Sequence, residues 1–496
     1  MPRYISVLVA VFVTAVAVLV ASGSPLPAHA VTTRTWTGGG LTKNFSTAGN
    51  WTPVGAPQNG DALVFPTPAA QFVTLQNDLV DLTVASIEFD ALGTTLAGNR
   101  LGVSSEIKQT AQMDDYIDLP IALKADITLT ATGASGRVFM RNRLQPLGTV
   151  AIDLAGHTLN KNGAGDMELN GDVIGGGVLS YNAGQSGTVV PLTYSGALRV
   201  AAGAELIIGE LGGGLGYCGS APNADLTLTG GKFTVTCAVT VNSVSGTGTV
   251  NVFSEGDSIT VGGKAGARFD GAITGAAKGI VNCCTKGPWV YGGTSSLPWL
   301  MYVTNNRLTL AGGSLASFAT LTVSGGGSIG GFGSFPDTLM YNAAAVFDTV
   351  DGEFGIARFP TLQTNDDVPV AFTIHGATPG AGFTQVQMSG QLDIAGAPLQ
   401  LKFDSYVPPL GQSYTLFNGA SAVLETFKNL PEGAQFTVGG FQFKITYKGG
   451  AGNDVVITRT GPASTPTTTA TATPTATPTP GGVLGNRRFL PQVARD

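Results

Sequence analysis

Glycine pairs interrupt short, alternating segments throughout residues 31–460. Four copies show the pattern most clearly: LTLTGG at 226–231, SITVGG at 258–263, LTLAGG at 308–313 and LTVSGG at 321–326. Apolar residues that alternate with small polar ones are typical of a β-strand, and glycine takes the positive φ of a turn without steric cost. One such unit cannot bury its own apolar face, whereas stacked copies can. The repeats therefore predict an all-β fold, a β-solenoid.

The composition indicates a folded chain and argues against nucleic acid as a partner. Of the 496 residues, 43% are hydrophobic and only 12% are charged, whereas ordinary globular proteins have about 25% charged residues. The 71 glycines would fit disorder, but Val, Ile, Leu and Thr are too abundant and too regularly alternated for a disordered chain. The net charge is −6, and no Lys/Arg cluster is combined with aromatic residues, as nucleic-acid binding would need.

Residues 1–30 have the features of a secretory signal peptide. A short basic start at Arg3 precedes an almost purely apolar run at 5–20, and the sequence AHA at 28–30 is a small-x-small cleavage site. The alternative is an uncleaved anchor, because the apolar run approaches the length that spans a bilayer. We expect cleavage before Val31 and an exported protein that is secreted or held at the cell surface. Contact with the membrane is then expected only through export or anchoring.

Export makes the four cysteines candidates for disulfides. Cys218 and Cys237 lie about one solenoid turn apart in the chain, so neighbouring coils can bring them within bonding distance. We predict a disulfide between these two residues. Cys283 and Cys284 are adjacent, which leaves either a strained vicinal disulfide or two thiols with other partners.

Composition divides the chain into six parts. These are a signal peptide at 1–30, an aromatic N-terminal cap at 31–72, β-helix coils at 73–344, terminal coils or a β module at 345–460, a Thr/Pro-rich stalk at 461–480 and a tail at 481–496. The cap contains Trp36, Phe45, Trp51 and Phe65. Such a cap is expected to cover the open end of the stack, where unpaired strand edges would template aggregation. The stalk has nothing to bury and favours extended polyproline conformation. The tail is either a sorting or anchoring signal or a frayed terminus.

The repeat also predicts dimensions and side-chain directions. Roughly 400 residues, at about 20 to 25 per coil and about 4.8 Å between strands, make a shaft of order 80 to 95 Å. Within residues 150–155, alternation predicts that side chains point inward at Val150, Ile152 and Leu154 and outward at Ala151, Asp153 and Ala155.

Three passages together resemble the passenger regions of autotransporter-type β-helix proteins, in which autotransporter-associated β-strand repeats occur. They are TWTG (35–38), GNW (49–51), GAP (55–57), GDALVF (60–65) and VASIEF (84–89) at the start, GGGSIGG (325–331) in the middle, and TFKNLPEGA (426–434) with YKGGAGNDVVI (447–457) at the end. The resemblance implies a right-handed parallel β-helix displayed outside the cell, adhesive or scaffolding rather than enzymatic. The chain departs from the family after residue 460, where no run of alternating ten-residue strands follows, so self-translocation is not expected.

One segment matches a calcium-binding repeat. GGAGNDVVI at 449–457 corresponds to one copy of the nonapeptide in which an aspartate, here Asp454, supplies carboxylate oxygen to the ion. Calcium in such repeats takes oxygens from successive turns, and only one copy is present. A glycine turn that enters the last strand is therefore favoured over a metal site.

A polysaccharide lyase or hydrolase is the main alternative for a parallel β-helix. Such chemistry needs a pair of carboxylates, or acidic metal ligands with a nearby Lys or Arg, on one exposed face. The candidates are Asp114, Asp115 and Asp118 in one loop, Arg141 and Arg143 about one coil later, and the pair Asp366 and Asp367. In so sparsely charged a chain, charged residues at loop tips more often prevent lateral association.

Histidine chemistry is not favoured. His157 and His375 are the only histidines of the mature chain, and neither has a Gly-x-Ser-x-Gly nucleophile motif beside it. Neither stands at zinc-finger spacing from a cysteine.

We therefore predict a secreted or surface-associated structural or adhesive β-solenoid, with no catalytic, cofactor-binding or metal-binding residue assigned. Extracellular glycans or neighbouring cell-surface proteins are its expected partners, and nucleic acid is not. A carbohydrate-active β-helix enzyme is the second hypothesis. A self-associating sheath or matrix subunit is the third.

Overall fold

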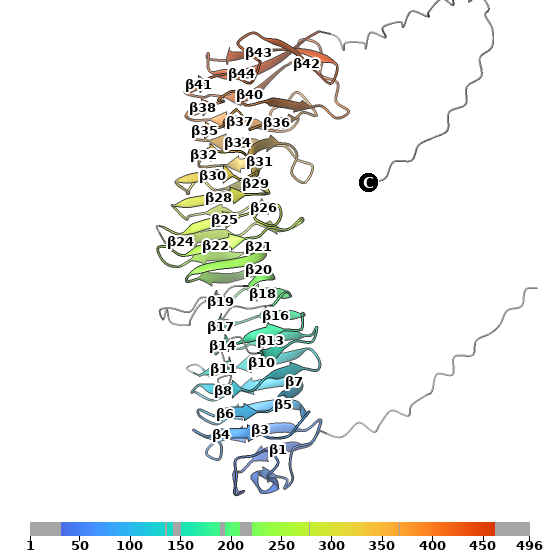
Figure 1. Cartoon of the computed structure of the whole chain (residues 1–496), viewed down its shortest axis with the longest axis vertical. Coiled ribbons are helices and arrows are strands. Elements are labelled where there is room, and N and C mark those ends of the chain that lie inside the picture. The colour runs from blue at the N-terminus through green and yellow to red at the C-terminus, as the bar shows by residue number, and fades with distance from the viewer. Residues whose placement is uncertain are drawn as a thin grey trace, which may run out of the picture.

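A computed structural model of the protein describes residues 31–133, 136–141, 150–188, 194–208, 221–276, 278–366 and 368–461. These residues form one long parallel β-solenoid, in which each coil hydrogen-bonds to the coils before and after it (Figure 1). The predicted all-β solenoid is thus confirmed. The one helical element of the described residues is a short 3-10 turn, Ala48–Asn50. None of the described segments forms a helix long and apolar enough to cross a membrane.

The first coils lie at the blue end of the stack (Figure 1). Their strands are β1 (Thr33–Trp36), β2 (Trp51–Thr52), β3 (Ala62–Pro66), β4 (Thr74–Asn77), β5 (Thr83–Asp90), β6 (Thr95–Gly98), β7 (Leu101–Gln109), β8 (Asp115–Asp118), β9 (Ile121–Leu123), β10 (Ile127–Ala131), β11 (Arg137–Arg141), β12 (Val150–Asp153), β13 (Thr158–Asn162), β14 (Asp166–Asn170) and β15 (Asp172–Ile174). Parallel pairing sets Leu63 beside Ile87 and Ile87 beside Ile107. All three side chains are fully buried, so the register stacks apolar residues into a continuous core.

The middle coils continue the same stack. Their strands are β16 (Val178–Tyr181), β17 (Gly184–Thr188), β18 (Ala197–Ala201), β19 (Ala204–Ile208), β20 (Ala221–Val235), β21 (Ala238–Val252), β22 (Ser258–Val261), β23 (Arg268–Phe269), β24 (Ala272–Gly275), β25 (Ile280–Cys283), β26 (Trp289–Tyr291), β27 (Thr294–Ser295), β28 (Leu300–Thr304), β29 (Arg307–Ser314), β30 (Thr320–Ser324) and β31 (Ser328–Ser334). The repeated LTLTGG-type segments fall in β20, β22, β29 and β30. In β20, Leu226 and Leu228 are buried and Thr227 between them is half-buried, as the alternation predicts.

The last coils lead into an antiparallel end. Their strands are β32 (Asp337–Met340), β33 (Ala344–Phe347), β34 (Ile356–Phe359), β35 (Leu362–Gln363), β36 (Val370–Thr373), β37 (Gln385–Met388), β38 (Gln391–Asp393), β39 (Leu399–Lys402), β40 (Ser413–Asn418), β41 (Ala422–Leu424), β42 (Gln435–Val438), β43 (Phe441–Gly449) and β44 (Asp454–Gly461). Parallel pairing continues to β41, whereas β42, β43 and β44 pair antiparallel. The turn between β42 and β43 lies at Gly439 and Gly440, both with positive φ.

One predicted side-chain direction is wrong. Ala151 is 1% exposed and faces the core, like Ile152 and Leu154. The register of β12 against β15 shifts between Val150 and Ile152, so strict alternation fails at this point.

Four large aromatic side chains gather at the beginning of the stack. Trp36, Phe45, Trp51 and Phe65 are at most 1% exposed. The rings of Trp36 and Trp51 meet edge to face with their centroids 5.0 Å apart, a favourable arrangement of aromatic quadrupoles. That this cluster protects the edge of the solenoid stays a prediction.

Candidate functional site: an axial ladder and the Arg358 groove

One row of outward-facing residues follows the solenoid axis from β17 to β40. Parallel register places each member opposite the next: Gln185, Glu205, Lys232, Thr249, Ala272, Thr294, Ser314, Ser334, Arg358, Gln387 and Asn418. We call this row the axial ladder. Neighbouring strands lie about 4.8 Å apart, so the ladder presents one side chain to its surroundings at each coil.

At the N-terminal end of the ladder, the polar side chains of Gln185, Glu205 and Lys232 interact with one another. Glu205 accepts hydrogen bonds from Gln185 Nε2 and Lys232 Nζ, both at 3.0 Å, and from Thr234 Oγ1 at 2.5 Å. Burial alone would raise the pKa of Glu205, but the hydrogen bonds from Thr234 and Lys232 outweigh it and lower the pKa. This part of the ladder has its charges paired internally.

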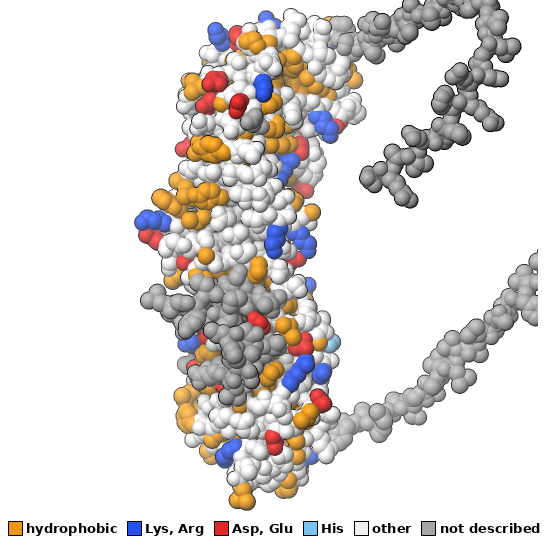
Figure 2. All heavy atoms as spheres, viewed as in Figure 1, with side chains coloured by type: hydrophobic (Ala, Val, Ile, Leu, Met, Phe, Trp, Pro, Cys, Tyr) orange, Lys and Arg blue, Asp and Glu red, His pale blue; other side chains and the backbone are white. Residues whose placement is uncertain are grey.

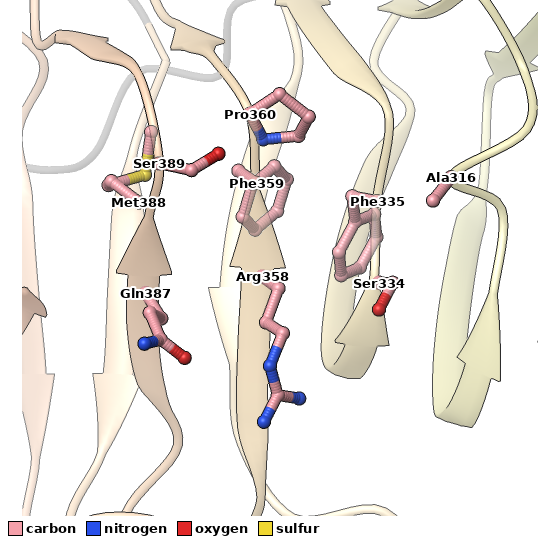
Figure 3. A pocket seen from close by; sticks show the side chains of 9 residues that line it. All are labelled: Ala316, Ser334, Phe335, Arg358, Phe359, Pro360, Gln387, Met388 and Ser389. Carbon is pink, nitrogen blue, oxygen red and sulfur yellow. The ribbon is translucent and has the colours of Figure 1, made fainter. Parts of the chain in front are cut away.

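The upper part of the ladder crosses a surface groove of about 370 Å³. Ala316, Ser334, Phe335, Arg358, Phe359, Pro360, Gln387, Met388 and Ser389 line it (Figure 3). We call it the Arg358 groove. Its side chains come from the ends of β31, β34 and β37, three neighbouring strands, together with Ala316 of the preceding coil.

The floor of the Arg358 groove is apolar and tightly packed. The rings of Phe335 and Phe359 stack in parallel with their centroids 4.3 Å apart. Phe335, Phe359 and Met388 are each less than 5% exposed. Since close-packed side chains of this kind hold single rotamers, the floor is a rigid support for the polar groups above it.

The polar side chains of the groove have no partner among the described residues. Arg358, Gln387 and Ser389 are exposed and Ser334 is half-buried, and none of these four side chains forms a hydrogen bond or an ion pair there. Arg307, by contrast, holds Asp348 through two hydrogen bonds of 2.6 and 3.0 Å. The nine lining residues include no Asp, Glu, His, Cys, Lys or Tyr, so the groove has donors for binding but no group for general acid–base catalysis near neutral pH.

The acidic segment predicted as a loop with catalytic candidates is mostly a strand, because Asp115 and Asp118 are the two ends of β8 and both are buried. Asp115, in β8, is fully buried. Its Oδ1 accepts a hydrogen bond of 2.9 Å from the Thr94 backbone N–H, and its Oδ2 lies 3.4 Å from Gln109 Nε2. Burial raises the pKa of Asp115 to about 7. Asp118 is only 7% exposed.

The predicted proximity of this loop to the next coil is confirmed for the backbone. β11, which ends at Arg141, pairs in parallel with β8. Asp114 Oδ1 accepts a hydrogen bond of 3.0 Å from the backbone N–H of Arg137. The side chain of Arg141 and all of Arg143 lie outside the described part of the chain.

The second acidic pair is described only in part. Asp366 is exposed in a loop, and Asp367 lies outside the described residues. The pairing of their carboxylates as a catalytic unit is therefore untested.

The two histidines of the described residues lie near aspartates at the surface. His157 Nδ1 is 3.6 Å from Asp126 Oδ1, and His375 Nε2 is 2.6 Å from Asp404 Oδ2. Asp404 also holds Lys402 at 2.8 Å. Hydrogen bonds from Lys402 and His375 lower the pKa of Asp404. The three side chains thus form a hydrogen-bonded cluster at the surface.

The calcium-like segment forms the turn between β43 and β44. Asp454 Oδ1 accepts a hydrogen bond of 2.8 Å from the Gly419 backbone N–H, and Asn453 Nδ2 donates to Ala420 O. The two side chains therefore hold the loop after β40. Within the described ranges, no group of three or more His, Cys, Asp or Glu residues is placed to hold a metal ion.

The structure describes both cysteines of one candidate pair, Cys283 and Cys284, but only one cysteine of the other. Cys218 lies outside the described residues, so its disulfide with Cys237 stays a prediction. Cys283 and Cys284 are fully buried and stand in the geometry of a vicinal disulfide, with their Cα atoms 3.7 Å apart. Of the two alternatives left open for this pair, the structure favours the vicinal bond.

The Arg358 groove was not predicted from the sequence. Ser334, Arg358 and Gln387 are far apart in the chain, and loops of unequal length separate their strands. Only the register of the coils brings them together. No protein-family model matches the chain, and no curated protein matches it either.

Proposed function

We propose that the protein is a secreted or surface-held β-solenoid that serves as a spacer and adhesive display surface without catalysis. The observation that carries this proposal is the parallel stack, which continues to β41, with one outward ladder from β17 to β40. A solenoid of this kind offers the same flat face coil after coil, so it suits many weak contacts with an extended partner. The resemblance to passenger β-helices supports the same role.

The surface chemistry fits an extracellular partner rich in hydroxyl groups. On the face that Figure 2 shows, acidic and basic side chains stand in small mixed groups on a mostly uncharged surface. Neutral hydroxyl and amide groups make up most of the axial ladder. Such groups match glycans or neighbouring cell-surface proteins, and they lack the positive field that nucleic acid needs.

Binding and turnover against a panel of acidic and neutral polysaccharides, with and without calcium, test this proposal. Binding of the purified protein without release of oligosaccharides is the expected result. Release of oligosaccharides would contradict it and favour a carbohydrate-active enzyme. Light scattering at several concentrations, run on the same samples, distinguishes a monomeric spacer from a self-associating matrix subunit.

A further inference from the structure

We propose that the Arg358 groove binds an acidic glycan, a polysaccharide chain that bears carboxylates and lies along the solenoid axis. The inference rests on the proposed adhesive function and names the ligand class and the place where it binds. It depends on three properties of the groove, namely its unpaired charge, its repeat distance and its rigid floor.

The positive charge of Arg358 favours an anionic ligand in the groove. Arg358 is exposed, has no carboxylate partner in the part of the chain that the structure describes, and stands among lining residues of which none is acidic. Two other recesses that contain a cation, those of Arg100 with Lys124 and of Lys448, are also lined by Asp or Glu, whereas the positive charge of Arg358 meets no acidic side chain among the residues that line its groove. A guanidinium binds a carboxylate through two parallel N–H donors, which gives both strength and orientation.

The spacing of the polar side chains along the axis favours an extended sugar chain as the ligand. Ser334, Arg358 and Gln387 follow one another in register across β31, β34 and β37 (Figure 3). The strands are spaced at about 4.8 Å, which is close to the advance of one pyranose unit in an extended polysaccharide. A carboxylate held by Arg358 would therefore leave the sugars before and after it beside Ser334 and Gln387. The serine hydroxyl and the glutamine amide both donate and accept, as sugar hydroxyls require.

The backbone around the groove argues against an extended peptide. Peptides that add to a sheet need a free edge with unpaired backbone N–H and C=O groups. β34 has partners on both sides, β31 before it and β37 after it, so its edges are occupied. Recognition must then use side chains, which favours a ligand whose own polar groups project sideways.

The floor keeps the polar groups in place before the ligand arrives. Phe335 and Phe359 stack face to face beneath the opening, and Met388 continues the same buried layer. A preorganised site loses less conformational entropy on binding than a mobile one. A shallow site of this size gives weak binding for one sugar unit, and a polymer gains affinity by engaging several molecules at once.

Calorimetric titration of the full chain with polygalacturonate, and with an uncharged galactan as the neutral probe, tests the proposal. The wild type is expected to bind polygalacturonate with an affinity that falls as salt is added, and to bind the galactan more weakly. Arg358→Gln should weaken polygalacturonate binding by about tenfold or more, the typical effect of losing a charged hydrogen bond. Lys278→Gln is the matched control, because it removes one positive charge from another exposed site and should leave binding unchanged.

The outcomes distinguish an error in the proposed binding site from an error in the proposed adhesive function. If Arg358→Gln binds polygalacturonate as well as the wild type does, the site is wrong while the adhesive function stands. If the wild type prefers the neutral galactan, the ligand class is wrong. If no polysaccharide binds at all, both the site and the adhesive part of the proposed function are overturned, and the spacer part remains.

Discussion

Lys161 shows how single polar residues are accommodated in an otherwise apolar stack. It takes an inward position between Leu129 of the coil before and Tyr181 of the coil after, and it is fully buried. Its Nζ donates to the carbonyl oxygens of Gly163 at 2.9 Å and Ala183 at 2.7 Å, and also to Gly165 O. The three ammonium donors are thus matched by three acceptors, although burial lowers the pKa of Lys161 to about 8.

Lys161→Met should destabilise the solenoid by roughly 2 to 4 kcal/mol, because carbonyl groups at the corner lose their donor in a buried setting. Thermal and urea denaturation followed by circular dichroism measure the change. Lys108→Met is the control, since Lys108 is partly exposed and pairs with Glu88 at the surface. An exposed ion pair contributes about 0 to 1 kcal/mol. Equal midpoints for the two variants would show that Lys161 does not hold its corner together.

Asp115 makes stability depend on pH. Its pKa of about 7 in the fold lies above the ordinary value of 3.8, so the native state keeps a proton that the unfolded chain releases between these pH values. The free energy of unfolding therefore falls as pH rises from about 4 to about 7, by on the order of 4 kcal/mol from this group. Asp115→Asn removes this dependence. We expect the variant to match the wild type at pH 4 and to melt higher at pH 8, and a constant difference at both pH values would contradict this.

At the scale of the element, glycines at the corners let neighbouring coils approach. Gly246, in β21, has a φ of +94° and lies opposite Leu228 of β20, whose carbonyl oxygen a Cβ at residue 246 would overlap. Gly256, with a φ of +88°, has open space where a Cβ would stand. Both positions need positive φ, but only Gly246 also needs the absence of a side chain.

The pair Gly246→Ala and Gly256→Ala separates these two requirements. Gly256→Ala should cost about 1 to 2 kcal/mol, the penalty of an L-residue in the left-handed region. Gly246→Ala should cost clearly more, because β20 and β21 must also move apart. Thermal denaturation of the two variants gives the comparison. Equal losses would show that coil packing tolerates the extra methyl group.

Local patterns in the sequence predict these elements well, but they do not predict the register between coils that builds the site. Alternation and glycine pairs indicate strands such as β20 and β29, since both signals depend on a few adjacent residues. Ala151 does not follow the alternation, because a register shift turns its side chain toward the core. Local patterns do not predict the Arg358 groove, because its polar residues come from strands separated by irregular loops.

At the scale of the whole molecule, the parallel stack determines the form of the surface. Each coil contacts its neighbours along one axis, so the surface is long and repetitive (Figure 1). The axial ladder uses this geometry to place polar groups in a line. Glu205 is paired within the ladder, whereas Arg358 has no partner among the residues that the structure describes. Composition and repeats predict the rod, residues 1–30 predict export, and the resemblance to passenger β-helices implies the adhesive role. They contain no signal for where a ligand would bind, because that depends on pairing between distant strands.

Incubation of the purified full chain with polygalacturonate, in which binding and the release of oligosaccharides are recorded on the same sample, tests the adhesive, non-catalytic role most directly. We expect a bound complex from which the polymer is recovered at its original length. Shortened chains or unsaturated products would show catalysis and contradict the proposed function.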